Sequence, residues 1–331
     1  MKKYVVKRFL ALTLALAATV SLAACSSANN NTNSSAANSS ISAEQKQSIT
    51  ITSLNANKEE VQVEVPYDAQ RIAILDMPSL DILDKLGLGD RVVGTADTSI
   101  EYLTEYVDTT ENLGTIKEAD LEAIMSVEPD IIFIGGRLAG SYDALSEIAP
   151  VVFLSTDTEL GVVESVRKNA TTIASIFGKE SEVETLMADF DDRIAKLNEF
   201  AKGKNAVIGM CTSGAFNTLG NDGRLSIIGK EIGFTNIASE DVTSTHGNES
   251  SFELLVDLNP EYMFILDRDA AISTEGAKLA QEIMDNELVA KTDAYKNDNI
   301  IYLAHPSIWY TAEGGITALD YMLSDLESEL L

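Results

Sequence analysis

The chain has 331 residues, of which 52 are acidic and 24 are basic, and its formal net charge is -28 at pH 7. This length has room for two domains, and the excess of negative charge excludes binding to nucleic acid or anionic lipid by general electrostatic attraction. The sequence contains two cysteines. Because we expect Cys25 to carry a lipid, Cys211 has no disulfide partner. A packed core must therefore stabilise the fold.

The N-terminus has the pattern of an export signal. Four basic residues precede an apolar run, residues 9–20, which is short and alanine-rich for a membrane span. The run leads into Leu-Ala-Ala-Cys, which resembles the lipobox of bacterial lipoproteins. We therefore expect residues 1–24 to be a signal peptide and Cys25 to carry the lipid that anchors the protein at the extracytoplasmic face of the cell membrane. A plain signal peptide with a chance cysteine is the alternative.

The Ser/Asn-rich segment 25–47 cannot bury a core, and it predicts a flexible tether. Residues 48–160 follow as a first α/β lobe, in which short apolar runs alternate with amphipathic segments. We expect strands at 71–76, 91–96, 130–136 and 151–155, and helices at 78–88, 120–127 and 142–149. This alternation predicts a parallel sheet with helices on both faces, so a ligand would lie beyond the carboxyl ends of the strands.

Residues 161–202 have the longest helical pattern, interrupted near Gly178, and are poor in glycine and proline. We interpret this segment as a rigid connector that permits only modest closure of the lobes. Residues 203–331 predict a second α/β lobe, completed by a final helix from Ile316 onward. The fold expected is therefore two Rossmann-like lobes with parallel sheets, joined by a long rigid helix, with the ligand cleft between the lobes.

Two stretches of the chain are near-twins. The sequence "LEAIMSVEPDIIFIGGR" begins at residue 121, and "FELLVDLNPEYMFILDR" begins at residue 252 with the same spacing. The matched positions are Glu122 with Glu253, Pro129 with Pro260, and Arg137 with Arg268. A generic helix–proline–strand unit is one explanation. The other is a pair of similar lobes in which one strand of each ends on an arginine that faces a wet cleft.

Motifs for catalysis or nucleotide binding are absent. The sequence has no G-x-S-x-G, Walker A or G-x-G-x-x-G motif. The mature chain has two histidines, His246 and His305, which are too few for the imidazole cluster of a zinc or manganese receptor. We expect no enzymatic activity and no intrinsic cofactor. An exported hydrolase with a triad of distant residues, or an adhesin, stays open as an alternative.

Three arginines follow a glycine or a strand end, namely Arg137, Arg224 and Arg268. Each could be a surface ion-pair partner, but a guanidinium is also well suited to a bulky anion. His246 and Tyr310 lie in polar loops on the predicted cleft side of the second lobe. They could be a solvated histidine and a core-capping aromatic, or an imidazole and phenolate donor pair for Fe(III).

The chain resembles the iron-siderophore receptors of ABC importers, which are class III solute-binding proteins. The motifs that carry this resemblance are "LGLGDRVVGTA", the twin stretches with their flanks, "LVAKT" and "WYTAEGG", between Arg71 and the C-terminus. The similarity is greatest to receptors of catecholate complexes. It implies that Arg137, Arg224 and Arg268 line the cleft and face an anionic ferric complex. It also implies that His246 and Tyr310 complete the iron coordination when the siderophore supplies two catechols.

The resemblance further implies that Glu122 and Glu253 dock on arginines of the permease, although they could simply be solvated helix residues. We expect Trp309 to contact the ligand and the receptor to be a monomer. Haem, a cobalamin or a hydroxamate siderophore are alternative ligands of the same fold. Glu313 departs from the family's "WYLSGGG" pattern and adds a carboxylate near the site, and we interpret His305 as a strand-end residue rather than a ligand.

Overall fold

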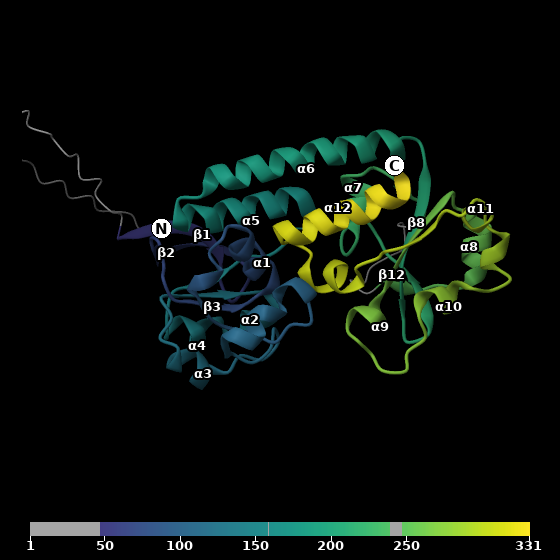
Figure 1. Cartoon of the computed structure of the whole chain (residues 1–331). Helices are drawn as coiled ribbons and strands as arrows, with labels where there is room; N and C mark the ends of the chain where they lie inside the picture. Colours follow the sequence, from purple (N-terminus) through teal and green to yellow (C-terminus); the bar gives the residue numbers. More distant parts are fainter. Residues whose placement is uncertain (1–46, 158, 239–246) are drawn as a thin grey trace, which may run out of the picture. The chain divides into compact units, whose positions relative to one another are not determined.

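Two separate sheets form the framework of the protein (Figure 1). The computed structural model describes residues 47–157, 159–238 and 247–331, which belong to one compact unit of the chain, residues 46–331. The predicted signal peptide, Cys25, nearly all of the tether and His246 lie outside the described residues.

The first sheet is parallel, with the strand order β5-β4-β3-β6-β7. Its strands are β3 (Ile72–Leu75), β4 (Val92–Thr95), β5 (Glu111–Asn112), β6 (Ile131–Ile134) and β7 (Val151–Phe153). The central strands "IAIL" and "IIFI" are buried at every position, as expected when helices cover both faces of a parallel sheet. The predicted strands of the first lobe are confirmed.

Short helices connect these strands. They are α1 (Met77–Lys85), η1 (Gly89–Arg91), η2 (Glu101–Leu103), α2 (Thr104–Thr109), α3 (Leu121–Ser126), η3 (Gly136–Ser141) and α4 (Tyr142–Ser146). A hairpin that the sequence did not predict precedes the sheet, formed by β1 (Ser48–Leu54) and β2 (Glu60–Pro66). The hydroxyl of Ser53 accepts a hydrogen bond from the Phe153 N–H at 2.9 Å, so the hairpin covers the edge strand β7.

The second sheet is mixed. Its strands are β8 (Asn205–Thr212), β9 (Ala215–Thr218), β10 (Thr235–Asn236), β11 (Asn248–Glu249), β12 (Tyr262–Asp267) and β13 (Ile300–Tyr302). Strands β10, β8, β12 and β13 are parallel, whereas β9 and β11 run antiparallel to their neighbours. The predicted parallel sheet is thus confirmed for four strands, and β9 and β11 add an antiparallel part that was not predicted. Ser213 and Gly214, with φ of 52° and 80°, form the two-residue hairpin turn after β8 that reverses the chain.

The helices of the second lobe surround this sheet. They are α7 (Ser226–Lys230), α8 (Phe252–Leu258), α9 (Arg268–Ala271), α10 (Ala280–Met284), η4 (Val289–Lys291) and α11 (Asp293–Lys296). Between β13 and the last helix lies η5 (Ile308–Ala312), a short π-helical turn.

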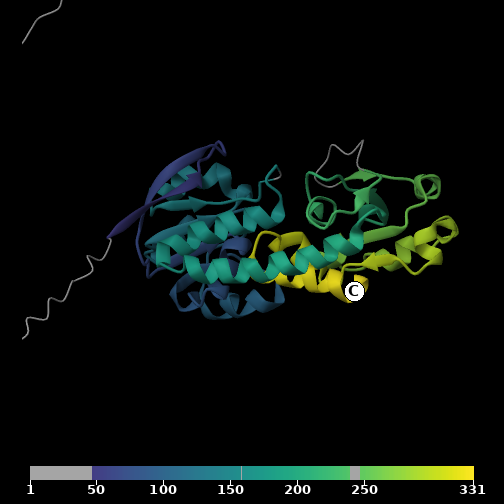
Figure 2. The same cartoon turned by 90° about the horizontal axis from the view of Figure 1, so that it is seen from above.

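Three long helices lie side by side along the two lobes (Figures 1 and 2). The connector consists of α5 (Val162–Phe177) and α6 (Glu180–Ala201), which meet at Gly178 in the left-handed conformation. The C-terminal α12 (Ile316–Leu330) packs on α1 and α6. It therefore does not complete the second lobe as predicted, but returns to the first lobe and the connector. No helix among residues 47–157, 159–238 and 247–331 has an apolar run that could span a bilayer.

Candidate functional site

The twin stretches produce equivalent structures in the two lobes. In each, a short helix ends at a left-handed residue before the proline, at Glu128 with φ 45° and Asn259 with φ 43°. The following strands, β6 and β12, both pair with two neighbours inside their sheets. Arg137 lies in η3, directly beyond β6, and Arg268 begins α9, directly beyond β12. Both arginines therefore stand at the carboxyl end of an inner strand, as predicted.

Tyr310 is held between two arginines. The guanidinium carbon of Arg224 lies 3.9 Å from the centre of the Tyr310 ring, and Arg224 Nη1 donates to the Tyr310 carbonyl at 2.5 Å. Arg268 Nε donates to the Tyr310 hydroxyl at 3.0 Å. Tyr310 lies in the π-helical turn η5, a local geometry that often occurs at functional sites. The phenol oxygen is thus directed toward a cation, and both arginines are fixed by the same side chain.

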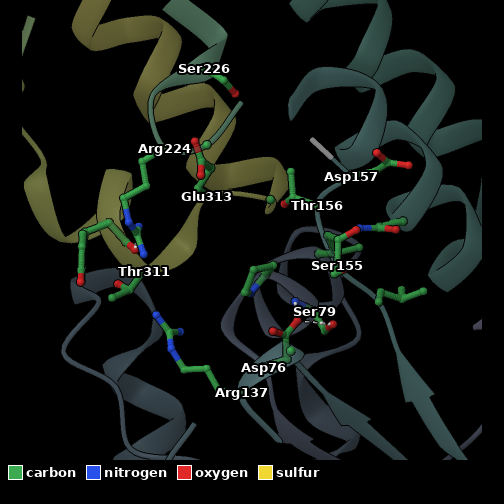
Figure 3. Close-up of a pocket in the computed structure, with 18 of the residues that line it drawn as sticks. Asp76, Ser79, Arg137, Ser155, Thr156, Asp157, Arg224, Ser226, Thr311 and Glu313 are labelled. Carbon is green, nitrogen blue, oxygen red and sulfur yellow. Dashed lines mark hydrogen bonds between the residues drawn. The ribbon is translucent and has the colours of Figure 1, made fainter. Parts of the chain in front are cut away.

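A cavity of about 280 Å³ opens beside this cluster. Its walls come from the start of α1, from η3, from the segment after β7, from the segment before α7, and from η5 with the residues that follow it. Arg137 and Arg224 point toward one another in this space, as Figure 3 shows. Other polar residues on the walls include Asp76, Ser79, Ser155, Thr156, Asp157, Ser226, Thr311 and Glu313. Arg268 does not line the cavity itself, but it contacts Tyr310, which does.

The arginines of the cavity lack the partners expected of surface ion pairs. Among the described residues, no carboxylate lies within salt-bridge distance of Arg137 or Arg224, although the chain is strongly acidic. Arg268 has Asp269 at 3.5 Å. Burial lowers the pKa of Arg224, and the charges of Arg137 and Arg268 act in the same direction, whereas Tyr310 and Glu313 oppose the shift. The three guanidiniums are thus close enough to repel one another, and of these only Arg268 has a carboxylate ion pair among the described residues.

Two partly buried carboxyl groups complete the walls. Asp76 follows β3 and caps α1, where its carboxylate accepts hydrogen bonds from the Ser79 N–H at 3.1 Å and from the Ser79 hydroxyl at 2.7 Å. Burial raises the pKa of Asp76, and it raises the pKa of Glu313 to about 7. Sequence analysis missed Asp76, although its place at the end of the "RIAIL" strand, which joins the same sheet edge as Arg137, was a usable signal.

The structure places the other predicted site residues elsewhere or leaves them untested. Trp309 is fully buried, and its indole N–H donates to Asp325 at 2.8 Å. Trp309 belongs to the core and does not line the cavity. The prediction that it contacts the ligand is therefore corrected, and its role is structural. His305 Nδ1 lies 2.7 Å from Asp325, consistent with a strand-end residue. The described residues contain no cluster of metal-binding side chains, and His246 lies outside them.

Comparison with known proteins identifies the family. The family described as periplasmic binding protein matches residues 72–306 of this chain. The chain belongs to the periplasmic binding protein family. The petrobactin-binding protein YclQ of Bacillus subtilis is 32% identical to it over 271 residues, which cover 81% of this chain and 84% of the relative. The ferric-anguibactin-binding protein FatB of Vibrio anguillarum is 26% identical over 266 residues, covering 78% of this chain and 81% of the relative.

Solved structures of periplasmic binding proteins have the same fold. The crystal structure of YclQ matches with a TM-score of 0.78 and 31% identity, covering 86% of this chain and 99% of that one. The structure of the periplasmic catecholate-siderophore binding protein VctP from Vibrio cholerae matches with a TM-score of 0.77 and 29% identity, covering 85% of this chain and all of the other. The predicted two-lobe α/β class is confirmed, and the family consists of binding proteins rather than enzymes.

The predicted docking glutamates occupy equivalent surface positions in this periplasmic binding protein. Glu122 lies in the first turn of α3 and Glu253 in the first turn of α8, and both side chains are exposed. Exposed apolar side chains flank them, namely Leu121 and Met125 beside Glu122, and Leu254 beside Glu253. Each lobe thus presents a carboxylate within a partly apolar patch.

Proposed function

We propose that this protein is an extracytoplasmic receptor that binds a ferric catecholate siderophore and delivers it to an ABC permease for iron uptake. The observation that carries the proposal is the Arg224–Tyr310–Arg268 cluster, with Arg137 approaching from the other lobe. Guanidinium groups donate to several oxygens at once and stack on aromatic rings, which suits a bulky anion rich in catechol oxygens. Two relatives that match most of this chain are named for petrobactin and for catecholate siderophores.

Charge supports the choice of an anionic chelate. Two catecholate dianions around Fe(III) leave a charge of about -1, and three leave about -3. Arg137 and Arg224 have no carboxylate ion pair among the described residues and are available to such a ligand. A complex with two catechols also has two open coordination positions. We propose that the Tyr310 hydroxyl and the His246 imidazole fill them.

Delivery to the permease is the second part of the proposal. Glu122 and Glu253 would dock on arginines of the permease, one from each lobe, because both are exposed at equivalent helix starts. The apolar side chains beside them, Leu121, Met125 and Leu254, would be covered in that complex. The receptor would act as a monomer that is tethered to the membrane through lipid on Cys25.

The proposal is tested by titrating the protein with ferric bis-catechol and tris-catechol complexes. Quenching of the Trp309 fluorescence by energy transfer to the coloured chelate reports binding, although Trp309 itself is buried. We expect saturable binding with a dissociation constant of about 1 µM or lower. Replacing Arg137, Arg224 and Arg268 together by Gln should weaken this binding at least about 100-fold, because three charge-assisted contacts are lost.

A neutral ferric hydroxamate complex is the comparison ligand. It carries no charge for the arginines to offset, so the catecholate proposal expects weak binding to the unaltered protein. Tight hydroxamate binding that survives the triple Gln substitution would assign the receptor to hydroxamates instead. Circular dichroism of the variant confirms that the fold is kept.

A further inference from the structure

Carboxyl groups outnumber arginines on the cavity walls. Of the described residues that line the cavity, Asp76, Asp157 and Glu313 carry carboxyls, whereas Arg137 and Arg224 carry guanidiniums. If all five groups were charged, an anionic ligand would meet a net negative wall at close range, which is unfavourable at low local dielectric. Arg268, which reaches the cavity through Tyr310, offsets one of these negative charges, so a single neutral carboxyl would leave the surroundings of the ligand net positive.

Glu313 is the carboxyl placed to be neutral. Its Oε1 is buried and has no hydrogen-bond partner among the described residues, while the side chain also accepts from the Leu225 N–H. Figure 3 shows Glu313 beside Arg224 on the cavity wall. The adjacent Gly314 has φ 116°, a conformation that favours glycine, and it lies close to Thr156 and Pro78. Asp76 differs because the Ser79 N–H and hydroxyl both bond to its carboxylate.

We propose that Glu313 binds the ligand in its protonated form, donating a hydrogen bond to an anionic oxygen of the chelate, so that capture of the ligand takes up one proton. This inference rests on the proposed function and names a specificity-determining residue for it. An ionised Glu313 would repel the ligand and leave the buried Oε1 without a hydrogen-bond donor. A neutral carboxylic acid removes the repulsion and supplies the missing donor.

The surroundings of Glu313 support this protonation state. Burial is the largest effect on its pKa, which it raises to about 7, and the nearby Glu231 carboxyl acts in the same direction. The charge of Arg224 and the Leu225 N–H oppose the rise. The charged or titratable groups on the other elements around this part of the cavity are Asp76 and Asp81 on the α1 side, Arg137 on η3, and Asp157 after β7.

The sign of the pH dependence follows from linkage. A bound anion favours the neutral acid further, so the pKa of Glu313 is higher in the complex than in the free protein. Affinity is then insensitive to Glu313 below about pH 6, where the acid is already neutral. Above pH 7 each unit of pH weakens binding about tenfold, until the pKa of the complex is reached.

The test compares the unaltered full chain with E313Q, which mimics the neutral acid in shape and as a donor. The probe is the Fe(III) complex of a linear bis(2,3-dihydroxybenzamide) chelator without amino groups, titrated at pH 6, 7 and 8. The ratio of the two affinities cancels the chelate's own titration. We expect the two affinities to converge at pH 6 and E313Q to bind about tenfold more tightly at pH 8. Calorimetry in two buffers at pH 8 should count close to one more proton taken up by the unaltered protein.

D157N is the matched control. Asp157 also lines the cavity, but it is exposed, and hydrogen bonds from the Leu160 and Glu159 N–H groups lower its pKa. Loss of the Asp157 charge should change the affinity for the chelate by the same factor at pH 6, 7 and 8. Equal pH profiles for the unaltered protein and E313Q, or weaker binding of E313Q at every pH, would overturn the role of Glu313 while leaving the receptor function intact. Absence of binding by both proteins would overturn the receptor function, and the inference with it.

Discussion

Tyr310 connects the two arginines of the second lobe through its ring, its hydroxyl and its backbone carbonyl. Its ring packs under Arg224 and its carbonyl accepts from that residue, while its hydroxyl accepts from Arg268. The contributions of the Tyr310 ring and of its hydroxyl can therefore be measured separately by mutation.

Y310F removes only the hydroxyl and keeps the ring against Arg224. For a ferric bis-catecholate, which leaves two positions open on the metal, we expect the affinity to fall about 10- to 100-fold, the value of one contact to a charged group. A ferric tris-catecholate has no open position and should bind with nearly unchanged affinity. Parallel fluorescence titrations with the two chelates measure the difference. Equal losses for both would show that Tyr310 does not reach the metal.

At the scale of elements, the strands and helices of the first sheet, from β3 to β7, could be predicted because short buried runs alternate with helical periods. The twin stretches also placed Arg137 and Arg268 correctly, since identical spacing produced the same left-handed turn before each proline. The role of Trp309 could not be predicted. The sequence "WYTAEGG" indicates a loop, whereas the structure forms a π-helical turn that directs Trp309 into the core, where Asp325 accepts its N–H.

The packing of α12 was also hidden from sequence analysis, because it depends on one distant carboxylate. Asp81 on α1 accepts hydrogen bonds from the N–H groups of Thr317 at 2.7 Å and Ala318 at 2.9 Å, and from the Tyr102 hydroxyl at 2.5 Å. A Cβ on Gly315 would lie 2.4 Å from the Asp81 carboxyl carbon, so glycine is needed there for this close approach. A residue 236 positions away thus caps the last helix.

D81A should destabilise the protein by about 3 kcal/mol, because it leaves buried N–H groups at the start of α12 without an acceptor. D120A is the control. Asp120 caps α3 in the same way, accepting from the Glu122 and Ala123 N–H groups, but this helix start is exposed. Its loss should cost about 1 kcal/mol or less. Urea unfolding measures both values, and equal effects would contradict the structural role given to Asp81.

At the scale of the whole molecule, the two lobes are joined by more than the predicted connector. Arg193 on α6 pairs with Asp320 at 2.6 Å and with Glu327 at 2.8 Å, both on α12. Glu231, directly after α7, accepts from the Val163 N–H at the start of α5. These contacts tie α12 and the second lobe to the connector, which supports capture of a ligand with modest closure of the cavity rather than a large rotation of the lobes.

The most direct measurement is ligand capture by the whole protein. The purified full chain is incubated with medium from an iron-starved culture of the source bacterium, re-isolated, and analysed by mass spectrometry and visible absorption. We expect an iron-containing catechol compound with a ferric-catecholate absorption band, and no such compound on the variant with Arg137, Arg224 and Arg268 replaced by Gln. Recovery of haem, a cobalamin or a hydroxamate, or equal capture by the variant, would contradict this expectation.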